Sequence, residues 1–149
     1  MNNHPIPFGI PNALFLYDDY PHPISVGGIT YPSVRHAVLS FKTMVVKIKK
    51  EIAQTTLPSD LKDYELEMPA PRWWKKEFIL GLGKILTLRK FKENPHLAEK
   101  LQATGETYLN DLPYSGQGDY GIKELTEVYN YRGNILMDVR EILRKQKAP

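Results

Sequence analysis

The sequence predicts an α+β fold that is mostly helical, with a small hairpin near the N-terminus, and three observations lead to this prediction. Six of the twelve prolines fall within residues 1–32, where short extended pieces and turns are expected because proline fixes its own φ and lacks a backbone donor. A Gly-Gly pair at 27–28 separates two apolar triplets, which is typical of a hairpin. From residue 34 onward, apolar side chains recur every three or four positions. The length of 149 residues predicts a single domain, residues 1–149.

The N-terminal third supplies the expected extended elements. Residues 13–17 (ALFLY) predict a buried strand, and residues 24–26 and 29–31 predict the two arms of the hairpin. An amphipathic helix is expected over 34–52, with Ser33 as its N-cap.

The rest of the chain predicts further helices joined by polar segments. Asn94 is placed to cap one of them, with Pro95 as its first residue. The expected elements are a loop over 55–72 with one short helix near Leu61, a helix from Trp73 or Trp74 to Lys92, a helix over 95–103, a strand over 106–112, a loop over 113–121 and a helix over 133–145.

Composition excludes several classes of protein. The chain has no cysteine, so disulfides, thiolate nucleophiles and cysteine-containing zinc sites are excluded. The four histidines are far apart, and we expect neither a metal site nor a cofactor. No apolar run approaches the length of a membrane span, and the first residues do not resemble a secretory signal, so a cytoplasmic location is expected. The net charge of +3 is too small to indicate nucleic-acid binding.

Three local patterns leave alternatives open. Residues 116–121 spell G-x-G-x-x-G, but they lie too close to the C-terminus for a dinucleotide-binding fold, so a plain turn or a glycine-rich loop near a phosphate remains. Residues 72–76 (RWWKK) fit either base stacking with phosphate neutralisation or a helix start whose tryptophans enter the core. His36, beside the apolar face of the helix expected over 34–52, fits a hydrogen-bonded structural histidine or a general base.

Three longer segments, taken together, resemble the NADAR (YbiA-like) superfamily. Residues 15–24 (FLYDDYPHPI) resemble the family's FLSNFYPSPF, and residues 30–36 (TYPSVRH) followed by Lys42 resemble TYPSVEHxxxxxK. Trp74 and residues 90–105 resemble W…KFxQNPxLxxxLxxTG, and residues 130–140 are similar to NxLGxxLMxVR. The resemblance covers residues 15–140. The small size and divergent sequence look most like a bacteriophage-encoded branch of the T-even intergenic kind, which implies the host cytoplasm and a host protein as a partner.

The resemblance implies a YbiA-like fold with a pocket for ADP-ribose-type or ribosyl-phosphate ligands. Characterised members of the family are N-glycosidases, so an active chain would hydrolyse N-glycosyl bonds. Breaking such a bond creates an oxocarbenium-like centre that a carboxylate can stabilise. In this chemistry Lys42 would hold a phosphate or trap the opened sugar, and Trp74 would stack on the base. Ligand-binding roles are also implied for the matching positions His36, Tyr120, Gly121 and Asn130.

One departure from the family pattern bears directly on catalysis. The family glutamate of SVEH is Arg35 here, and an arginine remains protonated and cannot act as a base. We therefore expect lost or altered N-glycosidase activity in a domain that binds a nucleotide or a protein partner. The alternative is a rebuilt site in which Asp18, Asp19 or Asp119 supplies the carboxylate and Arg35 grips a phosphate. Binding of nucleic acid through residues 73–76 is a third, less favoured hypothesis.

Overall fold

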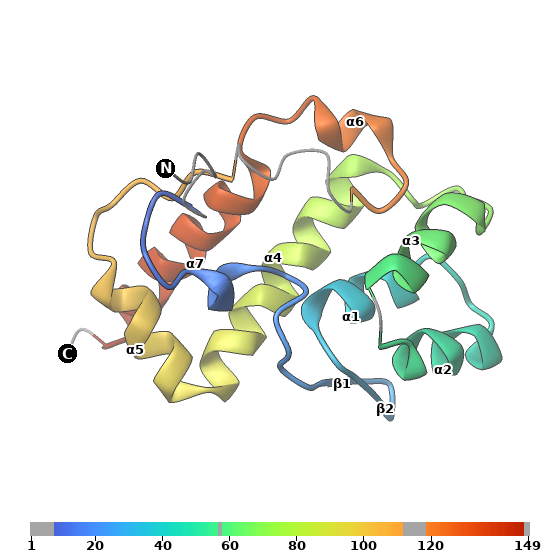
Figure 1. Ribbon diagram of the computed structural model, residues 1–149, viewed down its shortest axis with the longest axis horizontal. Coiled ribbons are helices and arrows are strands. Elements are labelled where there is room, and N and C mark those ends of the chain that lie inside the picture. Colours follow the sequence, from blue (N-terminus) through green and yellow to red (C-terminus); the bar gives the residue numbers. More distant parts are fainter. Residues whose placement is uncertain (1–7, 57, 112–118, 148–149) are drawn as a thin grey trace, which may run out of the picture.

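The computed structural model describes residues 8–56, 58–111 and 119–147, and helices account for most of them (Figure 1). The elements, in chain order, are the 3-10 helix η1 (Leu14–Leu16), the strands β1 (Ile24–Val26) and β2 (Ile29–Tyr31), and the helices α1 (Val34–Ser40), α2 (Val46–Gln54), α3 (Pro58–Glu67), α4 (Lys76–Glu93), α5 (Pro95–Ala103), α6 (Lys123–Thr126) and α7 (Tyr131–Lys147). No helix within the described part of the chain is long and apolar enough to span a membrane. The prediction of a mostly helical α+β fold is confirmed.

The hairpin forms where the sequence predicted it. Strands β1 and β2 pair antiparallel, with Ile24 opposite Tyr31 and Val26 opposite Ile29. Gly27 and Gly28 both have positive φ, which is the conformation that the tight turn between the strands requires. The two side chains that point inward, Ile24 and Tyr31, are buried.

Two helix caps also lie where they were predicted. Ser33 accepts a hydrogen bond from the backbone N–H of His36 at the start of α1. Asn94 accepts one from the backbone N–H of Leu97 at the start of α5, with Pro95 as the first helical residue. Each cap pairs a backbone donor that has no partner within the helix.

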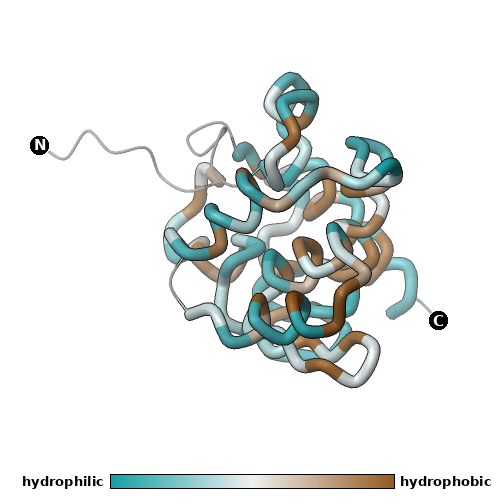
Figure 2. Tube along the Cα trace, turned by 90° about the vertical axis from the view of Figure 1, so that its right-hand side faces the viewer, coloured by the Kyte–Doolittle hydropathy of each residue, from teal (hydrophilic) through white to brown (hydrophobic). Residues whose placement is uncertain are grey.

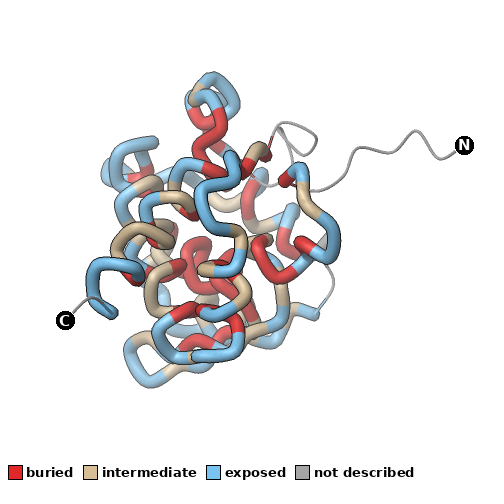
Figure 3. Tube along the Cα trace, turned by 90° about the vertical axis from the view of Figure 1, so that its left-hand side faces the viewer, coloured by how far each residue is buried: buried red, intermediate tan, exposed pale blue. Residues whose placement is uncertain are grey.

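Helix α4 is the central element, and it contacts α1, α5 and α7 (Figure 1). One apolar core lies between the hairpin, α1, α2, α3 and the first half of α4, and includes Tyr31, Val38 and Ile79. The second lies between residues 8–16, the last part of α4, α5 and α7, and includes Phe15, Phe91 and Val139. Figure 3 shows the buried stretches inside, with the outer turns of the helices exposed on that side.

Four predicted elements differ from the structure. Within residues 13–17, the structure has η1 at Leu14–Leu16 instead of a strand. The helix expected over 34–52 is two helices, and the hydroxyl of Thr43 accepts from the backbone N–H of Val45 between them. The short helix near Leu61 is the ten-residue α3. Instead of a strand over 106–112, the described residues up to 111 form one isolated bridge, between Phe8 and Asn110.

Candidate functional site

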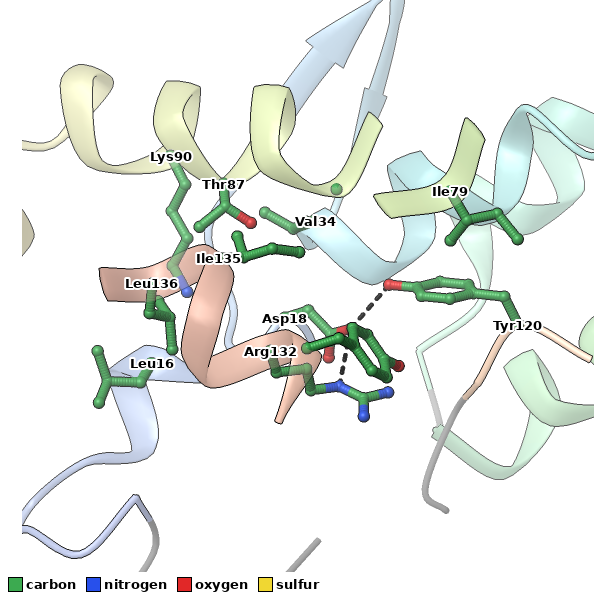
Figure 4. Close-up of a pocket in the computed structure, with 12 residues that line it drawn as sticks. Leu16, Asp18, Val34, Ile79, Thr87, Lys90, Tyr120, Arg132, Ile135 and Leu136 are labelled. Atoms are coloured by element: carbon green, nitrogen blue, oxygen red, sulfur yellow. Dashed lines mark hydrogen bonds and ion pairs between the residues drawn. The ribbon is translucent and has the colours of Figure 1, made fainter. Parts of the chain in front are cut away.

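A small cavity lies where the two apolar cores meet, beside α4 and the start of α7 (Figure 4). Its volume is about 30 Å³, comparable to that of one water molecule. Apolar side chains from both cores form most of its wall, and its polar lining comes from Asp18, Thr87, Lys90, Tyr120, Tyr131 and Arg132. A ligand the size of a ribosyl phosphate therefore requires some of these side chains to move.

Asp18 is the carboxylate that lines the cavity. The hydroxyl of Tyr120 donates to its Oδ2 at 2.7 Å, and Nε of Arg132 lies 3.7 Å from the same oxygen (Figure 4). The backbone also fixes this position, because the N–H of Arg35 donates to the carbonyl of Asp18 at 2.8 Å. Asp18 thus lies between a phenol and a guanidinium contributed by the C-terminal part of the chain.

Asp119 faces the same arginine from the other side. Its Oδ1 accepts from the hydroxyl of Tyr131 at 2.9 Å and from Nη1 of Arg132 at 3.5 Å. Its Oδ2 is buried and has no hydrogen-bond partner among the described residues. Burial of Arg132 lowers its pKa, but Asp18 and the other neighbours outweigh this, and the net shift is upward. Arg132 is therefore a permanent cation between two carboxylates.

Arg35, at the position of the family's glutamate, is buried and ion-paired. Its Nε donates to Oε1 of Glu65 in α3 at 3.0 Å, and its Nη1 lies 3.9 Å from Oδ2 of Asp19. Burial raises the pKa of Glu65, and Arg35 opposes that shift. Burial and then the charge of Asp18 raise the pKa of Asp19, whose side chain is 42% exposed.

Lys42 and Gly121 meet at the backbone of Glu65. Nζ of Lys42 donates to the carbonyl oxygen of Glu65 at 2.7 Å. Gly121 has a φ of +75°, and a Cβ at this position would lie 2.0 Å from that same oxygen. The indole N–H of Trp74 donates to the carbonyl of Tyr120 at 2.8 Å, so Trp74 also holds this turn. Burial lowers the pKa of Lys42.

Lys90 is a second buried amine, and it lines the cavity. Its Nζ donates to the carbonyls of Phe15 at 2.6 Å and Tyr17 at 2.8 Å. Burial lowers its pKa to about 8, while Asp18 and Asp19 oppose the shift. Lys90 therefore holds the segment that carries both aspartates against α4.

Two predicted ligand-binding residues bond to the protein itself. Nε2 of His36 donates to the carbonyl of Thr55 at 2.7 Å, so in the neutral ring Nδ1 accepts from the hydroxyl of Ser33 at 2.6 Å. Burial lowers the pKa of His36, which favours the neutral form. This is the structural role that the sequence left open for His36.

Asn130 has a similar role. It accepts from the backbone N–H of Asp111 at 2.7 Å and donates to the carbonyl of Leu109 at 3.0 Å. These bonds hold the segment before residue 112 against the start of α7. The ligand-binding roles of His36 and Asn130 stay predictions that their hydrogen bonds do not favour.

The structure brings most of the other predicted residues together. We call Asp18, Asp19, Arg35, Glu65, Asp119 and Arg132 the charged cluster. Lys42, Trp74, Tyr120 and Gly121 border it. Three further residues near the site were not predicted from the sequence: Glu65, Lys90 and Arg132. Glu65 gave no signal because its segment was expected to be mostly loop, whereas Arg132 stands where the resembled motif has leucine.

The cluster is close to electrically balanced. Four carboxylates face two guanidiniums, and the amines of Lys42 and Lys90 lie beside them. No group of three or more His, Cys, Asp or Glu side chains within residues 8–56, 58–111 and 119–147 is arranged to hold a metal ion. The arrangement can donate hydrogen bonds to a polar ligand, and Asp19 can exchange protons with solvent.

The buried Arg35–Glu65 pair provides a test of this geometry. We expect Arg35→Met to lower the free energy of unfolding by about 3 kcal/mol, because it leaves the Glu65 carboxylate buried and unpaired. Glu65→Leu should lower it by less, because Arg35 keeps its 3.9 Å contact with Asp19. The double variant should be more stable than either single variant. Urea unfolding measures all three, and the exposed pair of Glu141 and Arg144, changed to Gln and Met, is the control. Additive losses in the buried pair would contradict the geometry.

The amine of Lys90 provides a pH test. With the pKa lowered to about 8 in the folded state, the unfolded chain binds more protons above pH 8, so stability rises with pH there. Between about pH 8 and pH 10, we expect the free energy of unfolding of the natural chain to rise by about 2 kcal/mol relative to that of the Lys90→Met variant. Urea unfolding at several pH values measures the difference between the two chains. Parallel pH profiles would mean that Lys90 remains fully charged when folded.

Comparison with known proteins supports the resemblance found in the sequence. A riboflavin biosynthesis protein of Vibrio vulnificus (strain YJ016) is 28% identical over 143 residues, which cover 90% of this chain and 36% of that protein. The chain thus spans about a third of that relative's length. The NMR structure of the Escherichia coli protein YbiA matches with a TM-score of 0.69 and 24% identity, covering 89% of this chain and 79% of YbiA.

No protein-family model matches the sequence. The structural match shows that the fold of this chain is that of YbiA, and the predicted YbiA-like fold is confirmed.

Proposed function

We propose that this chain binds a ribosyl-phosphate or ADP-ribose-type ligand at the charged cluster and that the family's N-glycosidase chemistry is lost or altered in it. One observation carries the proposal. At the position of the family's glutamate, the Arg35 guanidinium is paired with buried Glu65 at 3.0 Å. A permanent cation there opposes the positive charge that develops at the sugar carbon when an N-glycosyl bond breaks.

Ligand binding is supported by the donors around the cavity. The phenol of Tyr120 and the guanidinium of Arg132 both face Asp18, and either can turn its donor to a ribose hydroxyl or a phosphate once a ligand displaces that carboxylate. The relative from Vibrio is named for riboflavin biosynthesis, so ribosylamine 5-phosphates belong among the ligands to be tested, beside ADP-ribose.

The test of lost chemistry is a hydrolysis assay on ribosylamine 5-phosphates and ADP-ribosylated guanosine. We expect no release of free base by the natural chain above the uncatalysed rate. Exchanging the pair, Arg35→Glu with Glu65→Arg, keeps a buried ion pair and restores the carboxylate at position 35, and release should rise at least tenfold. The same exchange at the exposed pair Arg89 and Glu93 is the control. Release by the natural chain would contradict the loss.

Binding is measured separately, by the shift that ADP-ribose or ribose 5-phosphate gives to the melting temperature. A ligand that binds the folded chain raises the melting temperature by mass action. Tyr120→Phe removes only the hydroxyl that bonds to Asp18, so it should halve the shift or reduce it further. A chain that shows no shift with any of these ligands would refute the binding half of the proposal.

A second candidate function is an active N-glycosidase with a rebuilt site, which Asp19 favours. This carboxylate is 42% exposed, and its pKa is raised by burial and by Asp18, which favours proton transfer by this group. If the natural chain releases base, Asp19→Asn should lower the rate at least a hundredfold. Asp138→Asn, at an exposed aspartate of α7, is the matched control and should leave the rate unchanged. Equal rates in both variants would exclude Asp19.

A further inference from the structure

A groove with a basic rim lies between the hairpin and α2, away from the charged cluster. Its volume is about 550 Å³, and Val26, Ile29, Phe41 and Val46 supply apolar walls. Lys49 and Lys50 are the charged residues in its lining, and no acidic side chain lines it within the described part of the chain. The groove therefore fits an object that combines apolar and negatively charged groups.

The lysines and the exposed valine of this groove share one face of α2. Lys49 and Lys50 come three and four positions after Val46, so both lie beside it on the helix. Val46 is 55% exposed. Nζ of Lys49 donates to the carbonyl of Ser40 at 2.8 Å, which leaves Lys50 at the open rim of the groove.

Helix α3 carries the complementary pattern with the opposite charge. Leu66 and Glu67 come three and four positions after Asp63, all three are exposed, and Leu66 is 69% exposed. The exposed charged side chains of α3 carry a net negative charge, which the basic groove can accept together with Leu66; they are Asp60, Lys62, Asp63 and Glu67. Figure 1 shows the hairpin, α2 and α3 at the same end of the molecule, and α2 contributes residues both to the groove and to the space beside α3.

We propose that the groove beside α2 binds α3 of a second copy of this chain, in a symmetric dimer. A two-fold axis can bring two different patches into contact. When the patches lie on opposite sides of the axis, each patch of one copy contacts the other patch of the second copy. An axis along α2 thus places Leu66 of each copy in the groove of the other, with Lys50 facing Asp63 and Glu67. Figure 2 faces this side of the molecule, where hydrophobic and hydrophilic stretches alternate along the exposed helices.

The chemistry of the groove favours this occupant over a nucleic acid. Sites for single-stranded nucleic acid present open aromatic rings on which bases stack. Of the two aromatic residues that line this groove, Tyr31 is buried, and the amine of Lys49 lies over the ring of Phe41 at 5.2 Å from its centroid. Trp73, the half-exposed tryptophan of the basic segment, donates its indole N–H to the carbonyl of Phe41 at 2.8 Å and does not line the groove. The proposal does not depend on the ligand of the charged cluster.

The test is sedimentation velocity on the full chain over a range of concentrations, at low and high salt. We expect a dimer at about 50 mM salt whose dissociation constant rises at least tenfold at about 500 mM, because salt screens the rim charges. Lys50→Glu and Glu67→Lys should each raise the constant at least tenfold at low salt, since each places like charges together. The double variant, which exchanges the two charges, should restore the dissociation constant to within threefold of that of the natural chain. Lys92→Glu, an exposed reversal on α4, is the matched control and should change nothing.

Three results would overturn the proposal. The first is a chain that stays monomeric at about 100 µM and low salt, a concentration at which even weak dimers associate. The second is a dimer that Lys50→Glu and Glu67→Lys leave intact, which would place the interface elsewhere. The third is a monomer that binds a fluorescent oligothymidine and loses this binding with Lys50→Glu, which would assign the groove to nucleic acid. Circular dichroism of each variant shows that its helices are retained.

Discussion

The carbonyl oxygen of Glu65 joins three segments that are far apart in the sequence, and the charged cluster depends on this junction. Lys42, after α1, donates to this oxygen, and Gly121 approaches it so closely that any Cβ would overlap it. The same residue turns its carboxylate to Arg35. The backbone carbonyl of Glu65 thus fixes the turn that presents Tyr120 to Asp18. Its carboxylate is the anion that neutralises Arg35. The positive φ of Gly121 and the absence of a side chain are both required for this approach.

The features that were predictable from the sequence are those set by neighbouring residues. The Gly-Gly turn needs only its own φ angles, and the caps at Ser33 and Asn94 need only a backbone N–H three residues away. The break between α1 and α2 was missed because the apolar spacing continues through it, while Lys42 turns inward to reach α3. Residues 13–17 were taken for a strand because a short apolar run does not distinguish a buried strand from a helical turn.

The candidate site was only partly predictable, for a related reason. Arg35, Lys42, Trp74 and Gly121 were found because each occupies a position of the resembled motifs. Glu65 belongs to no motif, and its importance comes from a contact with a residue 30 positions away. His36 shows the converse, since the sequence left both a site role and a structural role open, and both of its ring nitrogens bond to nearby protein groups. Position within a motif therefore indicates proximity to the site more reliably than it indicates contact with a ligand.

The balance of charges explains how a cation can stand at position 35, where the resembled motif has a glutamate, without unfolding the chain. A buried arginine is stable only where its charge is paired and its donors are used, and Glu65 and Asp19 provide this pairing for Arg35. The same balance constrains any ligand. A phosphate that enters the cluster must displace a carboxylate from Arg35 or Arg132, and that carboxylate must then turn to solvent, take up a proton or find another donor. Asp19 can turn to solvent, because its side chain is 42% exposed, whereas Glu65 is buried. Ligand entry on the Asp19 side of the cluster is therefore less costly than entry beside Glu65.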